Sequence, residues 1–273
     1  MKLPTLAIAA TCLVIGFFIG FAYTNSRNRA FLREQIEKAR AEAFAASNRT
    51  PTGAAPDDEI HRNPNIETVL AEAASKRGDF DTQVRLGIFL AEHGRITEAR
   101  ECFEAAVKLR PDDWQALAIL GRLLAAESKY PEAIARFEAA YKLQPNNGQI
   151  VVGLANALFD AKRYEEAQKW YEKALTLTPK DVNVITDLGL TYYFRRPQQL
   201  EKAMEYFRQS LSIDPNHTLT LQNYAVALLD ANRPEEAKPI VEKLAQLAPQ
   251  NEMLPVLRQR LAQANTTGNI PPH

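Results

Sequence analysis

Apolar residues recur along residues 79–249 in paired stripes with helical spacing, and a short polar break separates the two stripes of each pair. In one unit the two stripes are Leu120, Gly121 and Leu124, and then Ala133, Phe137 and Ala140. Two such stripes predict a pair of antiparallel helices. Small residues such as Gly121 and Ala133 let the two helices approach closely. The ring of Phe137 is expected to fill the gap to the next pair.

A proline ends each unit at a nearly constant interval. These prolines are Pro111, Pro145, Pro179, Pro215 and Pro249, with steps of 34, 34, 36 and 34 residues. A fixed period of this size indicates stacked supersecondary units, because a single globular core imposes no period on the chain. Proline cannot continue a helix, so each one is expected to stop the second helix of its pair. The longer step predicts a two-residue insertion in the turn between Phe194 and Leu200.

The period and the recurring small and apolar offsets resemble the tetratricopeptide repeat, a helix-turn-helix unit. The resemblance covers about five repeats and implies an all-α fold, a right-handed superhelical α-solenoid. An amphipathic stripe from Ile66 to Ala73, closed by Gly78, predicts a capping helix before the repeats. After Pro249 a second stripe, Met253 to Leu261, predicts another, with Arg260 facing water. The solenoid with its capping helices is therefore assigned to residues 64–265, and residues 266–273 to a disordered tail.

The N-terminal segment has a different pattern. The 21 residues from Leu3 to Tyr23 carry no charge, and a helix of that length spans a hydrocarbon core of about 30 Å. We predict a single transmembrane helix over residues 1–24, a juxtamembrane amphipathic helix over 25–46 and a flexible linker over 47–63. Gly16 and Gly20 form a G-x-x-x-G pattern, which favours helix packing in a membrane and hence a homodimer.

Flanking charge bears on the orientation of this anchor. The basic residues that follow the span are Arg27, Arg29, Arg33, Lys38 and Arg40, whereas only Lys2 precedes it. The positive-inside rule then favours a single-pass protein of the bacterial inner membrane with the repeats on the cytoplasmic side. Delivery of the repeats outward, a common bacterial arrangement, is the alternative.

Composition and motifs argue against catalysis. Lys plus Arg and Asp plus Glu balance at 33 each, so no net field favours nucleic acid as a partner. The two cysteines and four histidines are scattered without metal-ligand spacing. The sequence contains no phosphate-binding loop, dinucleotide fingerprint or nucleophile elbow. We therefore expect no catalytic residues, no metal site and no cofactor, and a protein that is not an enzyme.

The resemblance implies a concave groove, lined by the first helices of the pairs, that binds a peptide. The offsets that face the groove in the family fall here on Arg85, Arg122, Asn156, Phe159, Thr186, Tyr193, Gln222 and Asn223. Amide side chains both donate and accept hydrogen bonds, and so suit a peptide backbone. Arginines suit carboxylates, and the two aromatic rings suit apolar side chains. The alternative is that this face is polar only to keep the protein soluble.

These features together predict a membrane-anchored scaffold or assembly factor that binds a protein or peptide partner in its groove. Two alternatives stay open. The arrangement also resembles membrane-anchored repeat proteins of cytochrome c maturation, which hold an apoprotein tail outside the cytoplasm. A regulatory subunit of a membrane enzyme is the other.

Overall fold

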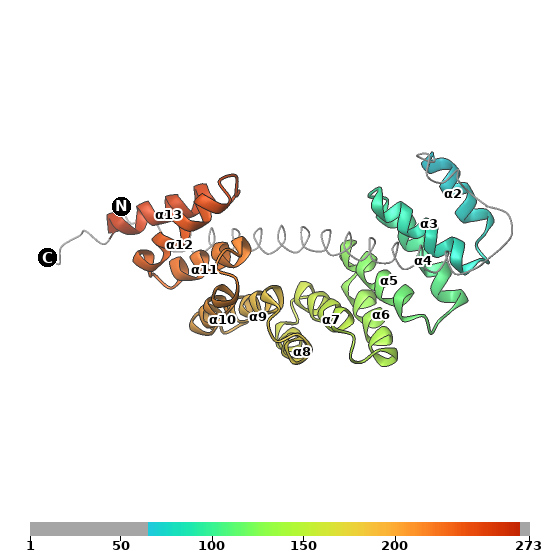
Figure 1. Cartoon of the computed structure of the whole chain (residues 1–273), viewed down its shortest axis with the longest axis horizontal. Coiled ribbons are helices and arrows are strands. Elements are labelled where there is room, and N and C mark those ends of the chain that lie inside the picture. Colours follow the sequence, from blue (N-terminus) through green and yellow to red (C-terminus); the bar gives the residue numbers. More distant parts are fainter. Residues whose placement is uncertain (1–64, 268–273) are drawn as a thin grey trace, which may run out of the picture. The chain divides into compact units, whose positions relative to one another are not determined.

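The computed structural model describes residues 65–267, and every regular element within this range is an α-helix (Figure 1). The helices are α2 (Ile66–Ser75), α3 (Phe80–Glu92), α4 (Ile96–Leu109), α5 (Trp114–Ala126), α6 (Tyr130–Leu143), α7 (Gly148–Asp160), α8 (Tyr164–Leu177), α9 (Val182–Phe194), α10 (Leu200–Ile213), α11 (Thr218–Asp230), α12 (Pro234–Leu247) and α13 (Leu254–Thr267). The all-α prediction is confirmed for these residues.

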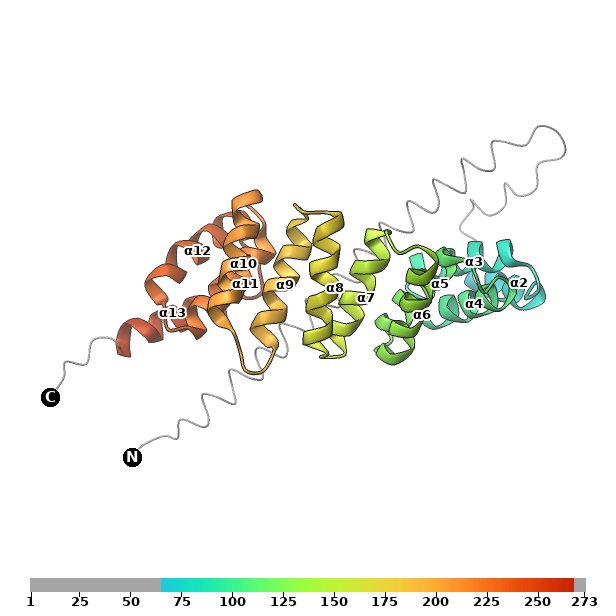
Figure 2. The same ribbon diagram turned by 90° about the horizontal axis from the view of Figure 1, so that it is seen from below.

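The chain divides into two compact units after Gln144. Within the described range, unit 1 holds α2 and the pairs α3–α4 and α5–α6. Unit 2 holds the pairs α7–α8, α9–α10 and α11–α12, followed by α13. In each unit the two helices of a pair lie side by side (Figure 2). The predicted helix pairs are confirmed, whereas the right-handed superhelix stays a prediction.

In three of the five pairs, close approach of the two helices depends on a glycine facing an aromatic ring. A Cβ atom added to Gly189 on α9 would lie 2.7 Å from the ring of Phe207 on α10, closer than van der Waals contact allows. The same relation holds for Gly87 with Phe103 and for Gly121 with Phe137. The ring of Phe137 therefore packs on the first helix of its own pair. The ring of Phe207 also lies 6.4 Å, between centroids, from that of Tyr224 on the next pair, in agreement with the expectation that this aromatic position fills the gap between pairs.

The turns agree with the sequence at several points. The second helix α4 ends at Leu109, two residues before Pro111, and the next helix begins after Asp113. The carboxylate of Asp113 accepts a hydrogen bond from the backbone N–H of Ala116 at 2.8 Å, which satisfies a donor at the helix start. The irregular turn lies between Phe194 and Leu200, as predicted.

The capping helix α2 ends earlier than expected, at Ser75, because a buried side chain serves its last carbonyls. Gln83 on α3 is only 1% exposed, and its Nε2 donates to the carbonyl oxygens of Ala73 (2.7 Å) and Lys76 (3.1 Å). Carbonyls at a helix end need such partners. The predicted stop at Gly78 is therefore wrong, and the polar residue that ends α2 lies on the following helix.

Several predicted segments lie outside the described residues. These are the anchor (1–24) with Gly16 and Gly20, the amphipathic helix (25–46), the linker (47–63) and the last six residues of the tail. Helix α13 reaches Thr267, two residues beyond the predicted limit of the repeats. Within residues 65–267 no helix combines the length and the apolar character needed to cross a membrane.

Candidate functional site

The eight candidate groove residues divide between the two units. Arg85 on α3 and Arg122 on α5 belong to unit 1. The other six belong to unit 2: Asn156 and Phe159 on α7, Thr186 and Tyr193 on α9, and Gln222 and Asn223 on α11. Each group is therefore described within its own unit.

The first helices of unit 2 are joined directly to one another. The rings of Phe159 on α7 and Phe194 on α9 meet edge to face, with centroids 5.8 Å apart. Helices α9 and α11 are joined at one end by a 2.6 Å hydrogen bond between Thr186 and Thr220, and further along by one from the Tyr193 hydroxyl to Asp230. We call the side of unit 2 formed by α7, α9 and α11 the first-helix face.

Thr186 does not lie on an open surface, contrary to the prediction. Its side chain is fully buried, and its hydroxyl lies 2.6 Å from that of Thr220 and 3.0 Å from that of Ser210. One partner of this hydroxyl is Ser210, which stands on α10 where the earlier second helices carry Ala106, Ala140 and Ala174. Since buried hydroxyls need hydrogen-bond partners, the three groups satisfy one another. Thr186 thus joins α9, α10 and α11, and its side chain offers no exposed surface.

The two aromatic candidates, Phe159 and Tyr193, differ in how much of their surface is exposed. Phe159 is 9% exposed and packs against Tyr164 (5.3 Å between ring centroids) as well as Phe194. It therefore stabilises the packing of α7 on its neighbours and offers little surface. Tyr193 is half-buried, and the Asp230 carboxylate that accepts its hydrogen bond also accepts one from Arg260 on α13 at 2.6 Å.

The pairing of Arg260 corrects a further expectation. The helical pattern of α13 placed this residue toward water, but its guanidinium reaches Asp230 on α11. Both side chains are about four-fifths buried, at 23% and 19% exposed. Asn251, just before α13, also contacts α11, because its Nδ2 donates to the Oε1 of Gln222 at 3.0 Å. Sequence reasoning missed Asp230, Arg260 and Asn251, since no local pattern links them.

The three amide candidates have unlike surroundings. Asn156 is half-buried, and its Oδ1 accepts a hydrogen bond from the Tyr171 hydroxyl at 2.7 Å. Gln222 is nearly buried and is bonded to Asn251. Asn223 is 4% exposed, and no group within residues 65–267 accepts a hydrogen bond from its Nδ2. Among these candidates Asn223 therefore carries a buried donor that still requires an acceptor.

In unit 1, Arg85 serves the packing of α2. Its Nη2 lies 3.0 Å from the Oε1 of Glu72, which also pairs with Lys76 at 3.1 Å. Partial burial raises the pKa of the Glu72 carboxyl, but the hydrogen bonds and positive charges of Lys76 and Arg85 outweigh this and hold its pKa below the ordinary value. Arg122 lies half-buried on α5.

The described part of the chain offers little reactive chemistry. Burial raises the pKa of the Cys102 thiol to about 11, so this buried side chain stays protonated at neutral pH and is a poor nucleophile. No group of three or more histidine, cysteine or acidic residues could hold a metal ion within residues 65–267.

Comparison with known protein families agrees with the repeated helix pairs. Models of the tetratricopeptide repeat match residues 84–147, 124–186 and 196–261. Comparison with curated protein sequences gave no match.

Solved structures share the fold over most of the described chain. MamA (residues 41 to the end) from Desulfovibrio magneticus RS-1 is similar at 21% identity with a TM-score of 0.58, over 65% of this chain and 98% of that one. PilF from Pseudomonas aeruginosa is similar at 24% identity with a TM-score of 0.58, over 73% of this chain and 87% of that one. YrrB, a TPR protein with an unusual peptide-binding site, is similar at 18% identity with a TM-score of 0.53, over 71% of this chain and 100% of that one. At these identities the likeness concerns the fold alone.

Proposed function

Because the chain belongs to the tetratricopeptide repeat family, we propose that it is a scaffold or assembly factor that binds a protein or peptide partner on the first-helix face of unit 2. Its mechanism is binding alone, with no catalytic step and no cofactor. YrrB, which has the same fold, carries a peptide-binding site.

The unsatisfied amide of Asn223 carries this proposal. A buried N–H group without an acceptor costs about 1–3 kcal/mol, so native proteins rarely retain one without a use. A carbonyl oxygen of a bound peptide supplies the acceptor that residues 65–267 lack, once the side chain turns so that its buried Nδ2 faces the ligand. Tyr193 and Asn156, both half-buried on the same face, offer further contacts to such a ligand.

We expect a photo-crosslinking residue at Asn183 to capture the partner. Asn183 is exposed at the start of α9, one turn before Thr186. The matched control places the same crosslinker at Glu205, an exposed residue on the second helix α10. Mass spectrometry of the captured protein is expected to identify one dominant partner from Asn183 only. Equal capture from both positions would contradict binding on the first-helix face.

The variant Asn223→Leu is expected to lower partner capture at Asn183 about tenfold, because one hydrogen bond of about 1.4 kcal/mol is lost. The same change leaves the folded protein as stable as before or more so, since an apolar side chain of similar shape replaces an unsatisfied buried amide. Capture and urea unfolding are measured on the same preparation. A loss of stability with unchanged capture would show that Asn223 serves only the packing of α11.

We also propose that residues 1–24 anchor the protein in the inner membrane, with the repeats on the cytoplasmic side. The support is the uncharged stretch from Leu3 to Tyr23 and the basic residues that follow it. Gly16 and Gly20 are proposed to pack two such anchors together.

The full chain is expected to stay with membranes after alkaline carbonate extraction, and a variant without residues 1–24 is expected to be released. Protease added to right-side-out vesicles should leave the repeats intact. Release of the full chain by carbonate would contradict the anchor. Digestion of the repeats would instead place them outside the cytoplasm.

A further inference from the structure

Helix α13 repeats the apolar pattern of the first helices. Its residues Leu254, Leu257 and Leu261 have the same spacing as Leu117, Leu120 and Leu124 of α5, and as Leu221, Tyr224 and Leu228 of α11. In those helices, each of which is followed by a second helix, the third position is buried, and Leu124 and Leu228 are 5% and 0% exposed. Within residues 65–267 no second helix follows α13.

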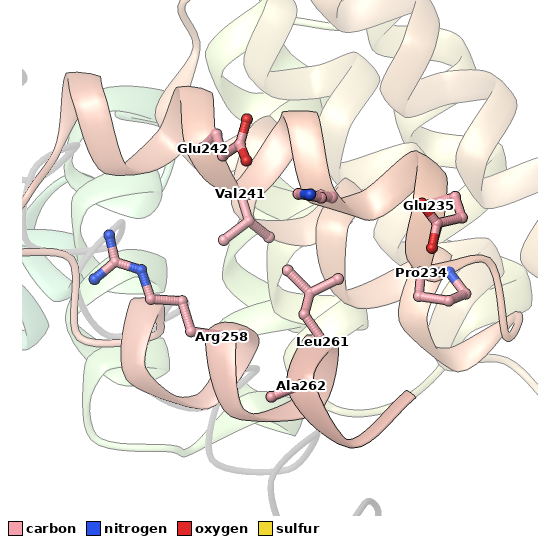
Figure 3. Close-up of a pocket in the computed structure, with 8 residues that line it drawn as sticks. Pro234, Glu235, Val241, Glu242, Arg258, Leu261 and Ala262 are labelled. Atoms are coloured by element: carbon pink, nitrogen blue, oxygen red, sulfur yellow. The ribbon is translucent and has the colours of Figure 1, made fainter. Parts of the chain in front are cut away.

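The face of α13 that a second helix would cover is instead the wall of a groove. Leu261 is only partly covered, and it lines a cavity of about 320 Å³ together with Ala262 and with Pro234 and Val241 of α12 (Figure 3). An apolar groove of this kind on a helical repeat suits a further helix, because burial of apolar surface is the main source of affinity.

The charges beside the groove define what fits it. Arg258 on α13 occupies the position that holds a small residue in the first helices, such as Gly121 on α5 and Ala225 on α11. Across the groove from Arg258, at the same end, lies Glu242 of α12, while Pro234 lies at the other end (Figure 3). Both charged side chains are exposed, and neither forms an ion pair within residues 65–267. The exposed Glu235 and Lys238 of α12 also line the groove, so a fitting occupant carries charges of both signs, with an acid opposite Arg258 and a base opposite Glu242.

We propose that the occupant is a second copy of this chain. A two-fold axis along the groove places α13 of one copy over α12 of the other. Arg258 then faces Glu242 of the second copy, and the same pair forms again on the other side of the axis. The exposed apolar wall at Leu261 is buried in the same step. This interface is distinct from the first-helix face and from Gly16 and Gly20, so it holds whether or not those proposals do.

The test uses cysteine pairs in the full chain, kept in mild detergent, with Cys12 replaced by serine. One preparation carries Glu242→Cys and the other Arg258→Cys. The two are oxidised separately and as a mixture. We expect a disulfide-linked dimer only in the mixture, with the 242–258 linkage identified by mass spectrometry. A matched pair at exposed positions elsewhere in unit 2, Lys169→Cys on α8 and Glu205→Cys on α10, is expected to give no dimer.

Two results would overturn the proposal. One is the absence of the 242–258 linkage from a mixture of chains whose circular dichroism equals that of the parent. The other is a mixed disulfide that forms no faster than in the Lys169 and Glu205 control, since random collision then explains it.

Discussion

Replacement of Phe207 by alanine is expected to lower the free energy of unfolding of unit 2 by about 3–5 kcal/mol. The ring is fully buried in α10, packs against Gly189, and lies 6.4 Å from the ring of Tyr224 on α11 between centroids. Its removal leaves a cavity among three helices, which neighbouring side chains fill only in part. Urea unfolding followed by the fluorescence of Trp170, in a Trp114→Phe background, reports on unit 2 alone.

The matched control for this variant is Ile213→Ala on the same helix. Ile213 is 38% exposed, so its truncation is expected to cost less than about 1 kcal/mol. Equal losses from the two variants would show that burial of the Phe207 ring contributes no more than any apolar side chain of α10.

Replacement of Gly189 by alanine is expected to destabilise unit 2 by about 1–3 kcal/mol, although alanine is the better helix former. The added Cβ would lie 2.7 Å from the Phe207 ring and 3.2 Å from the backbone oxygen of Ala203, so α9 and α10 must move apart. The measurement is the same urea unfolding, with Gly148→Ala as the control. A Cβ at Gly148 meets nothing within 4 Å, and that variant is expected to be neutral or slightly stabilising.

A double-mutant cycle separates this clash from any other effect of the new methyl group. In a Phe207→Val background the cost of Gly189→Ala is expected to disappear, because the ring that meets the Cβ is gone. The fifth helix pair already has this combination, with Ala225 on α11 and Val241 on α12 at the corresponding positions. An unchanged cost in the valine background would contradict the clash as its cause.

The helix pairs and the irregular turn could be predicted because their signals are local. A stripe with helical spacing and a proline stop depend only on residues a few positions apart, as at Leu109 and Pro111. The close-packed position on each first helix could be predicted as small, since glycine or alanine recurs there in every repeat. The end of α2 could not be predicted, because Gln83, on the next helix, donates a hydrogen bond to its carbonyl oxygen at Ala73.

The candidate site was predicted less well than the fold, for the same reason. The family offsets selected both Thr186 and Asn223. The hydroxyl of Thr186 is hydrogen-bonded to Ser210 and Thr220, whereas the Nδ2 of Asn223 has no acceptor within residues 65–267. The sequence by itself determined an all-helical repeat with its period and its insertion, because these follow from the face that each helix presents. Only the tertiary structure decided which polar groups satisfy one another, such as Arg260 with Asp230, because that depends on what a neighbouring helix places opposite them.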